Sequence, residues 1–344
     1  MDVHKQYTHA LVERGDEILR EQRVYHEKGA IKAFLAGVEP GSPVAVEATG
    51  NWYWVVDEIE EAGCVPRLVH PRKAKLLMGL TNKSDKLDTR GMNTLQRNKT
   101  LPVVWIPPGE LRDKRDLPRA RMVMKNQSTR LRNRLHATLA KYMIAAPEAS
   151  DIFAPGARQA LLGCIGQLPE HSRFSVEREL AMIDELSEQV ELFETRIEEV
   201  FERSREVEIL DTLPGVGFTL AVVQSVEIGD VERFARAEKL VGYCGTAPVV
   251  KSSGGKIRFG RLRSDVNRYL KWAFIEAANV VCMNQARWAQ RHVVQLYRRV
   301  RSRRDHPKAI GAVARHLTEA AYWMLKKGEA YKEPHWQPSS STKA

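Results

Sequence analysis

Four carboxylates in the N-terminal part of the chain could form a metal site. Asp2 opens a first strand-like segment, and Glu47 ends the run SPVAVE, which is typical of a buried strand. Asp85 and Asp88 lie three residues apart in NKSDKLDTRG, so a helix would present both on one face. Carboxylates placed in this way could hold two Mg²⁺ ions about 3.5–4 Å apart, which clamp the attacking and leaving oxygens of a phosphodiester.

The same carboxylates have a purely structural interpretation. Asp85 and Asp88 could be the N-cap and a first-turn acid of a helix, where the helix dipole favours negative charge. Taken alone, the pair favours this interpretation. Glu47 argues for the metal site, because an unpaired charge in an apolar strand is costly.

The segment KSSGGKIRFGR, residues 251–261, could supply a nucleophile from one of its two adjacent hydroxyls, Ser252 and Ser253. A serine hydroxyl is a weak nucleophile near neutral pH and needs activation or a well-stabilised leaving group. Cations of the segment could hold a phosphate and offset its charge in the transition state. They are Lys251, Lys256, Arg258 and Arg261. The alternative is a basic turn that only grips phosphate, because Ser-Gly pairs are ordinary turn residues.

Other segments of the second half suggest contact with nucleic acid. The run LPGVG resembles the hairpin of helix-hairpin-helix domains, in which Gly215 and Gly217 would let a phosphate approach backbone N–H groups. A plain tight turn is the alternative. Arg263 and Arg268 precede an apolar helical segment, and a second basic run spans 298–304.

Charge is strongly segregated along the 344 residues, whose net charge is +11. It is +6 over 101–150, −8 over 151–209 and +12 over 210–344. This distribution predicts a polyanionic partner for the basic parts, most simply nucleic acid. The four cysteines lie far apart and form no metal-binding pair, and no apolar run is long enough to span a membrane, so we expect a cytoplasmic protein with reduced thiols.

The elements that must position these residues fall into three regions. Residues 1–105 read as a strand hairpin with its turn near Gly15-Asp16, followed by alternating strands and helices, which is a mixed α/β pattern. Residues 106–206 contain a basic helix over 112–145, which Pro118 kinks or begins, an irregular stretch over 146–173, and an acidic helix over 174–206. Residues 207–332 form a mostly helical domain, and 333–344 a disordered tail.

The acidic helix carries apolar residues at a spacing of three and four. This stripe predicts a coiled-coil hairpin with the basic helix, and a helix packed on a globular core is an equal alternative.

Taken together, five segments of the chain resemble the insertion-sequence 110 family of transposases, also called DEDD transposases or bridge-RNA-guided recombinases. The resemblance extends over nearly the whole chain and depends on the order and separation of the segments. They are DVHK, VEATGNW, NKSDKLDTRG, LPGVGFTLA and GYCGTAPVVKSSGGKIRFGRLRSDVNRYL.

The resemblance implies an RNase H-like, RuvC-like N-terminal domain in which Asp2, Glu47, Asp85 and Asp88 bind Mg²⁺. It implies a coiled-coil middle and a C-terminal transposase domain whose reactive serine directly precedes the glycine pair, which corresponds to Ser253. It also implies DNA recombination guided by a structured RNA, by dimers that pair into tetramers. Because carboxylates and serine fall in different domains, we expect the full site to assemble when domains or subunits close.

The chain departs from the family pattern at two positions. Met1 directly precedes Asp2, so either the start lies upstream or half of the first strand is missing. We expect the chain to be impaired unless residues upstream of Met1 are restored, since a carboxylate at a frayed strand end would hold a metal poorly. Val266 replaces the usual glycine of its segment, which puts the local turn in question. Two other functions stay open, a junction endonuclease that uses the carboxylates and water, and a non-catalytic nucleic-acid-binding remnant.

Overall fold

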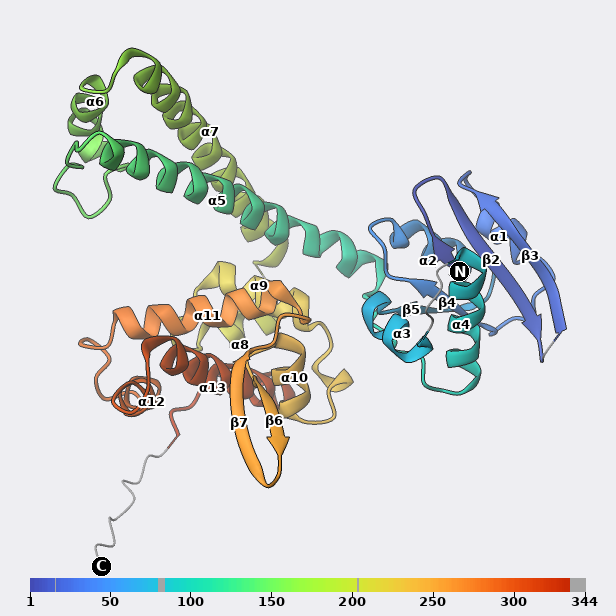
Figure 1. Ribbon diagram of the computed structural model, residues 1–344. Helices are drawn as coiled ribbons and strands as arrows, with labels where there is room; N and C mark the ends of the chain where they lie inside the picture. The colour runs from blue at the N-terminus through green and yellow to red at the C-terminus, as the bar shows by residue number, and fades with distance from the viewer. Residues whose placement is uncertain (16, 80–83, 203, 335–344) are drawn as a thin grey trace, which may run out of the picture. The chain divides into compact units, whose positions relative to one another are not determined.

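The computed structural model describes residues 1–15, 17–79, 84–202 and 204–334 (Figure 1). The chain divides into two compact units, Met1–Pro107 and Pro108–Ala344, and each is described by itself. The predicted division into an α/β region, a coiled-coil region, a C-terminal domain and a tail stays a prediction. Asp16 of the predicted turn and the tail from 335 onward lie outside the described residues.

The first unit is built on strands that Met1 connects into one mixed sheet. Strands β1 (Asp2–Val3), β2 (Tyr7–Arg14) and β3 (Glu17–Tyr25) are antiparallel, and β4 (Pro43–Glu47) pairs with β5 (Val65–Val69) in parallel. The nitrogen of Met1 donates to the Ala45 oxygen over 2.7 Å, and the Glu47 nitrogen donates to the Met1 oxygen over 3.2 Å. This is parallel pairing, so β1 lies between β2 and β4.

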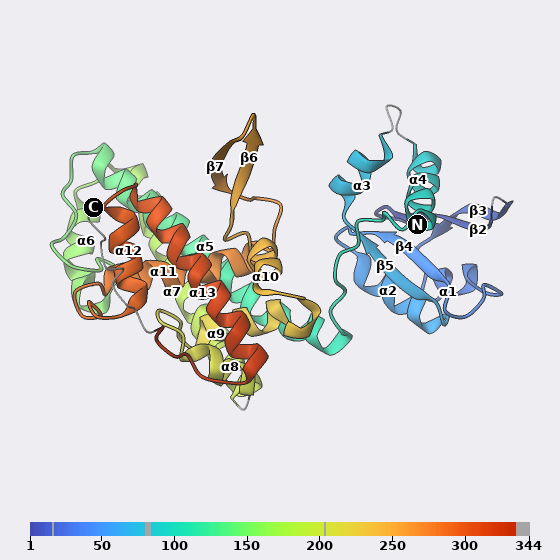
Figure 2. The ribbon, with the colours of Figure 1, turned by 90° about the horizontal axis from the view of Figure 1, so that it is seen from below.

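Helices cover both faces of this sheet (Figure 2). Val46 and the neighbouring Ala45 point to opposite faces of β4. Val46 packs with α1 (Ala30–Phe34) and α2 (Trp52–Glu61), while Ala45 packs with α3 (Pro71–Met78) and α4 (Asp85–Arg97). The predicted α/β pattern is confirmed, and the arrangement is consistent with a RuvC-like fold.

In its described residues, the regular structure of the second unit is helical except for one β-hairpin. Its helices are α5 (Gly109–Lys141), η1 (Pro155–Ala157), α6 (Arg158–Gly166), α7 (Glu170–Phe201), α8 (Arg205–Asp211), α9 (Phe218–Ile228), η2 (Val231–Arg233), α10 (Ala237–Cys244), α11 (Arg268–Met283), α12 (His292–Arg301) and α13 (His306–Lys327). The hairpin consists of β6 (Pro248–Ser253) and β7 (Lys256–Leu262). Among the described residues, no helix is both long and apolar enough to cross a membrane.

Helices α5 and α7 run side by side in opposite directions (Figure 1). The apolar stripe of α7 is buried, with Ile183 and Ile197 each 1% exposed. This confirms a helical hairpin, and its coiled-coil packing stays a prediction. Helix α5 begins at Gly109, so Pro118 lies inside the helix and does not begin it, and a kink at Pro118 stays a prediction. The expectation of an irregular stretch over 146–173 was wrong in part, because α6 occupies some of it.

A buried ion cluster joins α5, α9 and α11 in the second unit. Glu227 of α9 is 1% exposed and accepts hydrogen bonds from Arg115, from Arg119 Nε over 2.6 Å and from Asn267 over 2.7 Å. Asn267 also caps α11, because its Oδ1 accepts from the backbone nitrogen of Tyr269 over 3.0 Å. Burial by itself raises the pKa of Glu227, but the two guanidinium groups outweigh it and lower the pKa below the ordinary value.

Replacing Glu227 with Gln is expected to lower the free energy of unfolding by about 3 kcal/mol, because two guanidinium groups lose their counter-charge and one of them is buried. The matched control is Glu199→Gln, which removes an exposed pair with Arg196 and should cost less than about 1 kcal/mol. Urea unfolding followed by circular dichroism measures both. Equal losses would contradict the prediction.

The cluster also predicts a pH dependence. Since the pKa of Glu227 is lowered in the folded chain, unfolding takes up a proton below the ordinary pKa of 4.5. Its contribution to stability is therefore present above that value and is lost as the pH falls through the folded pKa. The Gln variant should accordingly show a smaller loss of stability between neutral and acid pH.

Candidate active site

Asp2 lies in the middle of the sheet, on β1, and is 5% exposed. The backbone bonds of Met1 place that residue level with Val46 on the parallel neighbour β4. Asp2 is therefore level with Glu47, and residues level with each other on adjacent strands share a face of the sheet. The side chains of Asp2 and Glu47 therefore leave their strands on the same face of the sheet.

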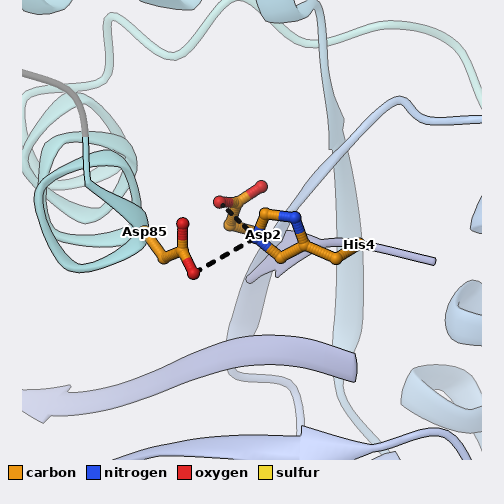
Figure 3. Close-up of side chains that lie close together, drawn as sticks. All are labelled: Asp2, His4 and Asp85. Atoms are coloured by element: carbon orange, nitrogen blue, oxygen red, sulfur yellow. Dashed lines mark ion pairs between the residues drawn. The ribbon is translucent and has the colours of Figure 1, made fainter. Parts of the chain in front are cut away.

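The imidazole of His4 lies next to the carboxylates of both Asp85 and Asp2 (Figure 3). His4 Nε2 lies 3.2 Å from Asp2 Oδ2 and 3.4 Å from Asp85 Oδ2. Asp85 Oδ2 also accepts a hydrogen bond from the Tyr7 hydroxyl over 3.0 Å. Tyr7 opens β2 and Asp85 opens α4, so residues more than seventy positions apart in sequence form one polar group.

The surroundings of Asp85 favour its ionised form. Its partial burial by itself raises the pKa of the carboxyl, but the hydrogen bond from Tyr7 and the charges of His4, His9 and Arg23 outweigh it, and the pKa is lowered. The same hydrogen bond raises the pKa of Tyr7. Asp85 is therefore a carboxylate at neutral pH, as a cation ligand must be.

Asp88 follows Asp85 in the first turn of α4, and Ser84 is the N-cap, since its Oγ accepts from the Leu87 nitrogen over 3.3 Å. The structural interpretation of Asp85 as an N-cap was therefore wrong. Asp88 and Glu47 are both half-buried. Neither belongs to the closest group of metal-ligating atoms among the described residues, so their part in the site stays a prediction.

That closest group fits a divalent cation. Asp2, His4 and Asp85 each offer one ligand atom, and these atoms all lie within 4.8 Å of one another. Carboxylate oxygens suit Mg²⁺ and Mn²⁺, and an imidazole nitrogen suits transition metals. The chain thus carries a possible metal-binding group made from two of the four predicted carboxylates.

His4 was not predicted as a site residue. The motif DVHK did contain a signal, because residues two apart in an extended chain point to the same side, and Asp2 and His4 have this spacing. Its approach to Asp85 had no such signal, because that approach depends on where α4 packs.

The two serines lie at the tip of the β6–β7 hairpin, which was predicted only as a turn. Gly254 and Gly255 form the turn with φ of 55° and 75°, a left-handed conformation that glycine adopts without strain. Ser253 pairs with Lys256 across the hairpin, and Ser252 pairs with residue 257. Since side chains alternate along a strand, the two exposed serines point to opposite faces.

The predicted basic contacts have different surroundings. Lys256, Arg258 and Arg261 are exposed on β7, whereas the Lys251 side chain lies outside the part that the structure describes. Arg263 is paired with Asp265 over 2.8 Å. The exposed Arg268 begins α11 and donates to the Tyr269 hydroxyl over 2.9 Å.

The glycines at 215 and 217 lie in the connection between α8 and α9, and the helix-hairpin-helix element stays a prediction. Gly215 has φ of 80°, and a Cβ there would lie 2.2 Å from the backbone oxygen of Ala277. Close packing against α11 thus requires Gly215 independently of any phosphate. Gly217 has open space around it, and phosphate binding by the two glycines stays a prediction.

The departure at Val266 is accommodated by packing. Its side chain fills the space next to Gly245, where a Cβ would lie 2.4 Å from the Val266 Cγ2. Gly245 ends α10 with φ of 71°, while Val266 does not have a positive φ. The left-handed residue at this junction is therefore Gly245.

Two family models match the chain. One, described as the transposase IS116/IS110/IS902 family, matches residues 207–294. The other, for the DEDD domain of IS110 elements and described as a transposase, matches residues 1–144. The first match contains the serine hairpin, and the second contains all four predicted carboxylates.

Several curated proteins are similar to this chain. An insertion element IS110 protein of 43.6 kDa from Streptomyces coelicolor is 33% identical over 42% of this chain and 35% of its own length. The transposase for insertion sequence element IS1328 of Yersinia enterocolitica is 20% identical over 80% of each chain. A probable family 20 transposase of Pseudomonas aeruginosa is 22% identical over 81% of this chain and 84% of its own. The first match thus spans about a third of that relative.

Proposed function

This chain belongs to the IS110 family of transposases, and we propose that it cleaves and rejoins DNA at the ends of its insertion sequence and at a target site. The observation that carries the proposal is the meeting of Asp2, His4 and Asp85 on one side of the sheet. Paired carboxylates next to a sheet centre are suited to phosphodiester chemistry, because they can hold a divalent cation where charge develops on phosphate.

In this proposal Asp2, Glu47, Asp85 and Asp88 hold Mg²⁺, and His4 is a further ligand. When bound, the cation polarises the scissile phosphate and lowers the energy of its negatively charged transition state. Level placement of Asp2 and Glu47 on neighbouring strands supports the strand-borne pair. The position of Asp88 one turn after Asp85 supports the helix-borne pair.

Ser253 is the proposed nucleophile. The alternation of side chains between the two faces of the hairpin favours Ser253 over Ser252. Ser253 shares its face with Lys256 and Arg258, whose charges can hold a phosphate. A bond forms between Ser253 Oγ and phosphorus while the bond from phosphorus to the leaving DNA oxygen breaks. The leaving oxygen keeps the electron pair and gains one proton, and the serine hydroxyl gives one up. The phosphoserine link conserves the bond for rejoining.

The basic surfaces are proposed to bind nucleic acid, namely DNA at element ends and target and a structured guide RNA. Exposed arginines of α12 and the cations of β7 support phosphate contact. Self-association into dimers or tetramers is part of the same proposal, because the resemblance to the family implies it.

The test is a plasmid that carries the DNA flanking the gene, incubated with the protein, Mg²⁺ and RNA transcribed from the same flank. We expect cleaved and joined products that require the RNA and disappear when the metal is chelated. Metal-dependent cutting of a four-way junction without RNA would favour the junction endonuclease. DNA binding without any cleavage would indicate the non-catalytic remnant.

A further inference from the structure

The face of the β6–β7 hairpin that carries Ser252 is apolar and exposed. Val250 pairs with Phe259, and strand alternation places both on the same face as Ser252. Val250 is 55% exposed and Phe259 71% exposed. The opposite face carries Ser253, Lys256 and Arg258. The hairpin thus presents an apolar face, defined by Val250 and Phe259, and a basic face.

The fold gives no reason for an exposed aromatic ring at this position. Both ribbon views show the hairpin extending away from the helices of its unit (Figures 1 and 2). Its base is what holds it, since Leu262 lies next to Gly311 of α13 and Lys271 donates to the Arg263 oxygen over 2.5 Å. Phe259 is several residues beyond this anchor, so its ring adds little to the core.

We propose that the apolar face binds unstacked bases of the DNA strand that Ser253 attacks, with Phe259 as the stacking residue. This inference rests on the proposed function. Aromatic rings stack on bases of any sequence, and apolar side chains enter between base steps when cations hold the neighbouring phosphates. Arg258 and Arg261 on either side of Phe259 are both exposed and supply those cations.

Charge favours this occupant over a second copy of the chain. Residues 210–344 carry a net charge of +12, so two such hairpins would meet with like charges. A DNA strand offers bases for the apolar face and phosphates for the basic face. Holding bases on one face would fix the phosphate near Ser253, so Phe259 is assigned as a positioning residue.

The experiment uses the full chain and a single-stranded DNA oligonucleotide with a fluorescent aminopurine base, whose emission falls when it stacks. Phe259→Ala should weaken binding about 10-fold and abolish the quenching. Phe259→Trp should keep both the DNA binding and the quenching of the wild type, because a tryptophan ring also stacks on bases. The matched control is Phe174→Ala, which removes a ring that is 63% exposed on α7 and should change neither readout.

Each other outcome overturns the inference. Unchanged quenching in Phe259→Ala, with cleavage by the wild type intact, would refute the base contact and leave the proposed function standing. A change in sedimentation of Phe259→Ala without DNA would assign the face to a second copy. Tighter binding of the same oligonucleotide as RNA would assign it to RNA, and no DNA binding by the wild type would remove the proposed function as well.

Discussion

Asp85→Asn is expected to abolish DNA strand cleavage, with a loss of at least about 100-fold, while leaving DNA binding nearly unchanged. Asp85 lies beside Asp2 and His4, and its carboxylate is kept ionised by Tyr7 and nearby cations. Asparagine keeps the size and one acceptor oxygen but removes the charge that a divalent cation needs. Asp88→Asn should also abolish cleavage if all four carboxylates act together.

Two measurements separate a lost metal site from a damaged fold. Calorimetric titration with Mn²⁺ should show weaker binding by Asp85→Asn, and circular dichroism should be unchanged. The matched control is Glu60→Gln on α2, an exposed acid of the same unit, which should bind the metal and cleave as the wild type does. Full cleavage by Asp85→Asn would refute the assigned site.

Ser253→Ala is expected to remove the covalent protein–DNA adduct completely, because no other group on its face of the hairpin tip offers a hydroxyl among the described side chains. Ser252→Ala should keep the adduct, since Ser252 points to the apolar face, away from Lys256 and Arg258. The two variants change the same atoms at neighbouring exposed positions, so each is the control for the other.

The measurement is to trap the protein on its DNA substrate and to separate the products on a denaturing gel. An adduct that survives in Ser253→Ala and vanishes in Ser252→Ala would move the role to Ser252. Cleavage by the wild type without any adduct would assign the attack to water and favour the endonuclease.

Local patterns were sufficient to predict most elements of the first unit. The run ending at Glu47 and the segment after Asn51 were read correctly as β4 and α2, because strand and helix periodicities are properties of a few adjacent residues. Helix α6 was missed, and the strands around Gly254 and Gly255 were read only as a turn. The tip of that hairpin, KSSGGK over 251–256, consists of serines, glycines and lysines, which carry a weak strand signal.

The sequence by itself determined which residues can do chemistry, through DVHK, the Asp85–Asp88 spacing and the serine–glycine run. Only the tertiary structure decided which of them meet. Asp2 and Asp85 are brought together because β1 lies between β2 and β4 and because α4 packs over them, and neither follows from local spacing. Likewise, position 215 requires glycine because the backbone of Ala277, which is far along the chain, packs closely against it. Such contacts depend on burial of apolar surface between distant segments, whereas hydrogen-bonded periodicity is set within each segment.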